Sequence, residues 1–165
     1  MKPQNNLHAF IWDLGGVILR AGDPTPNEPL AIRLSGDCCA ANPQPNLCIE
    51  AALVNFIRVL RSSYPTALLI QSREDLRLAL NNLWQFEDAF DEIFVSVDQD
   101  VWAQEMPDLS RALLQLHVKA GQATLIDDDP RHVRAAKAAG MPAIRYHDPA
   151  QIGSAVFAVL VEQAA

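Results

Sequence analysis

The sequence predicts a single α/β domain, built on a doubly wound, Rossmann-like parallel sheet of about five strands with helices on both faces. Short apolar runs with strand character alternate with segments of helical periodicity along the chain. Polar residues also stand where three of these runs stop, at Asp13, Gln71 and Asp127. Ligands of an open parallel sheet bind at the carboxyl ends of its strands, so we expect a ligand site at that edge.

The expected strands and helices alternate in order. Strand candidates are residues 9–12, 67–71, 92–96, 123–126 and 143–146. Helix candidates are residues 49–60, 76–83, 109–118, 130–139 and 149–161. Pro130 suits a first helical turn, and Gly140 suits the left-handed position that closes a helix.

Composition fits one domain spanning residues 1–165. Half of the 165 residues are apolar, which is enough for one good core and too little for two large ones. The formal net charge of −7 repels phosphate backbones and argues against nucleic acid as a partner. No apolar stretch approaches the length that spans a bilayer, and the first eight residues lack the features of a secretory signal. We therefore expect a cytoplasmic protein that does not bind membranes.

A Pro-rich stretch, residues 21–46, interrupts the alternating pattern. It holds five prolines, and an interior proline costs a helix about 3 kcal/mol, so the stretch cannot form one regular helix. Cys38, Cys39 and Cys48 are three thiols without a nearby His, which favours free thiols over a disulfide framework or a zinc site.

Residues 11–19, Ile-Trp-Asp-Leu-Gly-Gly-Val-Ile-Leu, resemble motif one of the haloacid dehalogenase (HAD)-like hydrolase superfamily. That motif is an apolar strand followed by Asp-x-Asp-Gly-Val. The resemblance implies a HAD-like core with Asp13 as the nucleophile, which forms an aspartyl-phosphate. Gly15 stands at the second Asp, which in the family donates a proton to the leaving oxygen and offers its backbone carbonyl to the metal. Gly15 keeps only the carbonyl.

Residues 124–136, with Ala139, Gly140 and Met141 after them, are similar to motif four of the same superfamily. The resemblance implies a Mg²⁺ site in which Asp128 is a direct ligand and Asp127 a direct or water-mediated one, together with Asp13 and the Gly15 carbonyl. The alternative is an exposed acidic loop whose carboxylates cap the next helix through its dipole.

Motif two of the superfamily ends its strand with a Ser or Thr that binds the phosphoryl group, and Ile70 takes that place here. The neighbouring polar residues Gln71, Ser72 and Arg73 are therefore our candidate substrate-binding residues. Ser72 also fits the N-cap of the helix predicted over residues 76–83, which would make its role structural.

Motif three supplies a Lys in the superfamily, and Ala103 lies near that position. No Lys occurs between Lys2 and Lys119. Arg73 or Arg111 could replace the charge, although a guanidinium is not equivalent to an ammonium group. The cap that covers the site in many members of the superfamily is much reduced, since only residues 21–46 stand in its place.

The resemblance implies a metal-dependent phosphohydrolase that works through Asp13 on a small phosphorylated molecule or a phosphorylated protein surface. The alternative is a catalytically inactive HAD-like fold that serves as a binding or regulatory module. A response-regulator receiver also gathers acidic residues at strand ends, but its acid pair follows the first strand. Here the lone acid comes early in the chain and the acid group comes late.

Overall fold

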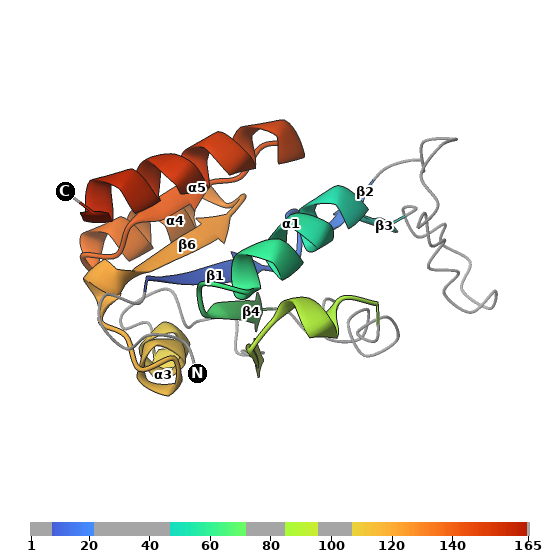
Figure 1. The fold of residues 1–165 in the computed structure, drawn as a ribbon. Coiled ribbons are helices and arrows are strands. Elements are labelled where there is room, and N and C mark those ends of the chain that lie inside the picture. Colours follow the sequence, from blue (N-terminus) through green and yellow to red (C-terminus); the bar gives the residue numbers. More distant parts are fainter. Residues whose placement is uncertain (1–7, 22–46, 72–84, 96–106, 165) are drawn as a thin grey trace.

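A five-stranded parallel sheet forms the centre of the protein (Figure 1). The computed structural model describes residues 8–21, 47–71, 85–95 and 107–164. The strands of the sheet lie in the order β5-β4-β1-β6-β7. Their bounds are β1 (Ala9–Asp13), β4 (Thr66–Ile70), β5 (Glu92–Val95), β6 (Ala123–Asp127) and β7 (Ala143–Arg145). Each strand ends within one residue of its predicted bounds, so the predicted fold class is confirmed.

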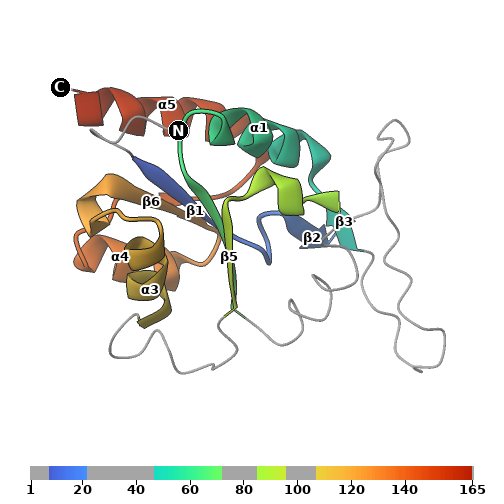
Figure 2. The ribbon, with the colours of Figure 1, turned by 60° about the horizontal axis from the view of Figure 1, so that its bottom comes forward.

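Helices cover both faces of the sheet, as Figure 2 shows. One face carries α1 (Ala51–Arg61) and α5 (Pro149–Ala164), and the other carries α3 (Pro107–Gln115) and α4 (Pro130–Ala138). Two short 3₁₀ turns, η2 (Glu87–Ala89) and η3 (Ala120–Gln122), precede β5 and β6. The helix predicted over residues 76–83 lies outside the described residues. Among those that are described, no helix is long and apolar enough to cross a membrane.

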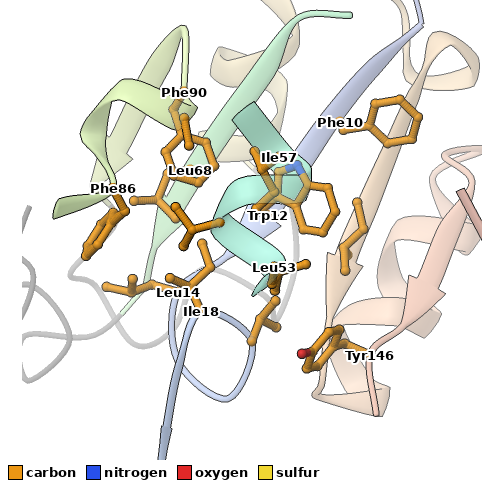
Figure 3. Close-up of a cluster of buried hydrophobic side chains, with 14 of the residues drawn as sticks. Phe10, Trp12, Leu14, Ile18, Leu53, Ile57, Leu68, Phe86, Phe90 and Tyr146 are labelled. Atoms are coloured by element: carbon orange, nitrogen blue, oxygen red, sulfur yellow. The ribbon is translucent and has the colours of Figure 1, made fainter. Parts of the chain in front are cut away.

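The core consists of two hydrophobic clusters, one on each side of the sheet. Side chains of successive strand residues point to opposite faces, so Phe10 and Trp12 pack toward α1 and α5 whereas Ile11 packs toward α3 and α4. Figure 3 shows the first cluster, in which the Trp12 ring lies beside Leu53 and Ile57 of α1. Because both faces are covered, the strands are mostly apolar runs, and the charged groups Asp13 and Asp127 stand at their ends.

A small antiparallel pair, β2 (Leu19–Ala21) and β3 (Leu47–Ile49), lies beyond the carboxyl end of β1 (Figure 1). The sequence did not predict this pair. It flanks residues 22–46 of the Pro-rich stretch, which lie outside the described residues. Ile49, predicted as the first residue of a helix, is instead the last residue of β3. The Glu50 N–H donates to the Ile18 carbonyl at 2.9 Å, and α1 begins one residue later at Ala51.

Candidate functional site

Asp13 is the last residue of the central strand, and its neighbours fix its position. β1 pairs with β4 on one side and with β6 on the other, and the Leu14 N–H extends the pairing by donating to the Leu69 carbonyl at 3.2 Å. Asp13 itself is only 7% exposed. The sheet therefore holds the Asp13 carboxylate at its carboxyl edge, in a largely buried place.

Asp127 ends the neighbouring strand β6, and its carboxylate is fully buried. One carboxylate oxygen, Oδ1, accepts the Asp129 N–H at 2.8 Å. The other, Oδ2, lies 2.9 Å from Nδ1 of His132, which lies in the first turn of α4. A buried charge needs such partners, and these two fix the direction in which the carboxylate points.

Asp128 follows on the loop, and its side chain lies against the backbone of Gly16. A Cβ atom added to Gly16 would fall 2.2 Å from Oδ2 of Asp128, and Gly16 has a φ of +74°. Both facts favour glycine at this position. Asp128 is exposed as a residue, but this contact shields its carboxylate. Partial burial and the charge of Asp127 together raise the pKa of Asp128.

These three carboxylates converge. One oxygen from each of Asp13, Asp127 and Asp128 lies within 4.8 Å of the others. An octahedral ion that holds its oxygen ligands at about 2.0–2.1 Å spaces neighbouring ligands by about 2.9 Å and opposite ligands by about 4.2 Å, so the three carboxylates would draw together around a bound ion. Three hard oxygen donors beside a glycine that leaves room for them fit a Mg²⁺ ion, and the cluster could hold one.

Gly15 lies in the same loop, two residues after Asp13, and its backbone pairs with Leu19. The loop is closed by further backbone bonds, including those from the Gly16 N–H to the Leu19 carbonyl and from the Leu19 N–H to the Leu14 carbonyl. That the Gly15 carbonyl ligates the metal stays a prediction.

Gln71, predicted to bind substrate, contacts the acidic cluster itself. Its Nε2 atom donates to Oδ1 of Asp13 at 2.8 Å and to Oδ2 of Asp127 at 3.2 Å. The preceding residue, Ile70, packs into the core and is 1% exposed, and Gln71, the next described residue, reaches the site. Ser72 and Arg73, the other two predicted substrate-binding residues, lie outside the described residues.

Asp129 plays the structural role that the sequence left open for the acidic triplet. It is the N-cap of α4, where its Oδ1 accepts the Arg131 N–H at 2.7 Å. Hydrogen bonding from the Arg131 side chain lowers the pKa of Asp129 to about 2. Helix capping therefore accounts for Asp129, while Asp127 and Asp128 lie beside Asp13.

Sequence reasoning missed three residues of this site. His132 orients Asp127, Gly16 makes room for Asp128, and the exposed Arg145 side chain donates to the Asp128 carbonyl at 3.4 Å. The signal for His132 was available, because the third residue of a helix that begins at a strand end lies close to that end. Of the two charges considered for motif three, Arg111 is exposed on α3 and Arg73 lies outside the described residues, as does Ala103 near the position of the Lys.

No family model and no curated protein matches the sequence. Solved structures, in contrast, resemble the fold. A predicted HAD-like family hydrolase from Porphyromonas gingivalis superposes with a TM-score of 0.65 at 16% identity, covering 94% of this chain and 98% of that one. An uncharacterized protein from Corynebacterium glutamicum gives a TM-score of 0.64 at 16% identity, covering 94% and 96%.

A third similar structure holds ligands. It is a variant of a HAD family enzyme from Bacteroides thetaiotaomicron in complex with magnesium and inorganic phosphate. The TM-score is 0.65 at 12% identity, and the match covers 91% of this chain and 98% of that one. At these identities the likeness establishes the fold: this chain folds as a HAD-like domain over most of its length.

Proposed function

We propose that this chain, which has the fold of HAD-like hydrolases, is a metal-dependent phosphohydrolase that works through Asp13. The observation that carries the proposal is the convergence of Asp13, Asp127 and Asp128 within 4.8 Å at the carboxyl edge of the sheet. In this proposal Asp13, Asp127, Asp128 and the Gly15 carbonyl hold one Mg²⁺ ion. Bound there, the ion would offset the negative charge of the acids and of a phosphoryl group.

The location of Asp13 at the carboxyl edge of the sheet supports its proposed role as the nucleophile. A carboxylate oxygen of Asp13 forms a bond to phosphorus while the bond from phosphorus to the leaving oxygen breaks. Water then hydrolyses the aspartyl-phosphate and releases inorganic phosphate. The pairing of β1 on both sides limits the movement of Asp13 during both steps, and His132 keeps Asp127 in place.

Gly15 restricts the choice of substrate, because it has no side chain that could protonate the leaving oxygen. General acid catalysis contributes about 10²- to 10⁴-fold to such reactions. We therefore propose substrates whose leaving group departs without a proton, such as aryl or acyl phosphates. Both a small phosphorylated molecule and a phosphorylated protein surface remain within the proposal.

Phosphate release from three substrates tests this function. The substrates are p-nitrophenyl phosphate, acetyl phosphate and a sugar phosphate, each assayed in Mg²⁺ and in EDTA. The proposal expects turnover of the first two in Mg²⁺, little turnover of the sugar phosphate, and none in EDTA. Turnover that survives EDTA, or that is unchanged by Asp13→Asn, would contradict it.

A second function, a binding or regulatory module without turnover, is favoured by one observation. The Gln71 amide donates to Asp13 Oδ1, an atom of the proposed nucleophile. Mg²⁺ binding without phosphate release from any of the three substrates would favour this module over the enzyme.

A further inference from the structure

The amide of Gln71 joins two buried carboxylates that belong to different strands. Its Nε2 atom lies 2.8 Å from Oδ1 of Asp13 at the end of β1 and 3.2 Å from Oδ2 of Asp127 at the end of β6. A primary amide carries two N–H donors, so the group has one donor for each carboxylate.

This arrangement lowers the repulsion between the Asp13 and Asp127 carboxylates in the metal-free protein. Asp13 is 7% exposed and Asp127 is fully buried, so little water screens the repulsion between their charges. The positive end of the amide dipole lies between the two carboxylates and offsets part of that repulsion. The neutral Gln71 amide thus offsets the same repulsion that a bound cation would offset.

The same contacts conflict with a bound ion. Mg²⁺ takes oxygen ligands at about 2.0–2.1 Å, and an ion on Asp13 Oδ1 would place its charge beside the positively polarised Gln71 hydrogens. The amide nitrogen has no lone pair to offer as a ligand. An ion bound to Asp13 Oδ1 or Asp127 Oδ2 would therefore compete with the Gln71 N–H groups for these atoms.

We propose that Gln71 is a positioning residue that stands in for the divalent cation: it holds Asp13 and Asp127 together in the metal-free protein and gives up these bonds when Mg²⁺ binds. The inference rests on the metal site of the proposed function. Its consequence is that the two hydrogen bonds oppose Mg²⁺ binding, so that removing them raises the affinity for the ion.

Gln71→Leu tests this by removing both donors. We measure the Mg²⁺ dissociation constant by calorimetry and the thermal unfolding midpoint in EDTA. The variant should unfold at a lower temperature in EDTA and bind Mg²⁺ at least about tenfold more tightly, because a hydrogen bond to a charged group corresponds to about a factor of ten or more.

Gln122→Leu is the matched control, since Gln122 lies at the opposite end of β6 and accepts the Lys119 N–H through Oε1 at 3.1 Å. It should leave the Mg²⁺ dissociation constant unchanged. Gln71→Asn is the second variant, for use if Gln71→Leu does not fold. The Asn side chain is shorter by one methylene group, so its amide forms weaker hydrogen bonds with Asp13 and Asp127. The affinity of this variant for Mg²⁺ should therefore be higher than that of the wild type.

The outcomes separate this inference from the proposed function. Wild type that binds Mg²⁺, with Gln71→Leu binding no more tightly, overturns the inference and leaves the proposed function standing. Binding by Gln71→Leu alone supports the inference and shows that the natural chain excludes the ion, which contradicts the proposed function. If neither protein binds Mg²⁺, both ideas are wrong.

Discussion

Replacing Gly16 with alanine should displace the Asp128 carboxylate without changing any acidic residue. The added Cβ would lie 2.2 Å from Oδ2, 2.4 Å from Cγ and 2.7 Å from Oδ1 of Asp128, where real contacts essentially never fall under 3.0 Å. Oδ2 must therefore retreat by about 0.8 Å, the difference between 3.0 and 2.2 Å. Metal sites hold ligand distances to about 0.2 Å, so a shift of this size would remove Asp128 from the proposed Mg²⁺ site.

Gly16→Ala should lower the free energy of unfolding only modestly, because the added Cβ clashes with the Asp128 side chain, which can rotate away. A residue with a Cβ in the left-handed conformation costs about 1–2 kcal/mol. Gly140→Ala is the matched control, since Gly140 has a φ of +76° and nothing within 4 Å of the added Cβ. Both variants should therefore lose about 2–8 °C in thermal midpoint in EDTA.

Mg²⁺ separates the two variants. Gly140→Ala should gain as much thermal stability from millimolar Mg²⁺ as the wild type gains, whereas Gly16→Ala should gain little. Adding Asp128→Asn to Gly16→Ala should change the Mg²⁺ response no further, because both changes remove the same ligand. A Gly16→Ala protein that keeps the full response would refute the claim that Gly16 positions Asp128 for the ion.

Three further predictions concern the leaving group, a buried histidine and the cap of α4. Gly15→Asp should raise turnover of a sugar phosphate more than turnover of p-nitrophenyl phosphate, since only the leaving oxygen of the sugar needs a proton. Equal gains on both substrates would contradict the claim that wild type lacks a general acid. Burial lowers the pKa of His8 from its ordinary 6.5, so the unfolded chain takes up a proton that the folded chain resists. The free energy of unfolding, measured with urea, should therefore fall as the pH drops below about 6.5, and His8→Phe should lessen that fall; an unchanged slope would exclude His8 as its source. Asp129→Ala should cost about 0.5–2 kcal/mol by removing the cap. The pKa of Asp129 is lowered from its ordinary 3.8 to about 2, so the stability that the ionised cap contributes is fully present above pH 3.8 and is lost as the pH falls towards 2. An Asp129→Ala variant that is still less stable than wild type at about pH 2 would contradict this role of the carboxylate.

The strands could be predicted because the sheet is covered on both faces. Each strand is then a short apolar run with a polar end, and such runs stand out in the sequence. The helix predicted over residues 109–118 instead ends at Gln115. There His117 adopts a φ of +56°, and the Val118 N–H turns back to the Leu113 carbonyl at 3.0 Å. Glycine usually marks such an ending, and here no glycine signals it.

The antiparallel pair β2 and β3 depends on contact between segments far apart in the chain, and strands of three residues carry too short a pattern to reveal it. The acidic cluster was predictable for the opposite reason. Neighbouring parallel strands end at the same edge, so Asp13 and the acids after β6 had to meet there. The partners of those acids were harder to predict, because the reach of Gln71 depends on Ile70 packing into the core.

Thermal unfolding of wild type and Asp13→Asn, each in EDTA and in millimolar Mg²⁺, tests whether Asp13 binds the ion. An ion that binds only the folded chain stabilises it by about 2.7 kcal/mol at a hundred times its dissociation constant. We predict that wild type gains stability from Mg²⁺ and that Asp13→Asn gains much less. In EDTA the variant should be at least as stable as wild type, because one of three crowded charges is gone. Equal Mg²⁺ responses in the two proteins would show that Asp13 does not bind the ion, and no response in wild type would contradict the metal site as a whole.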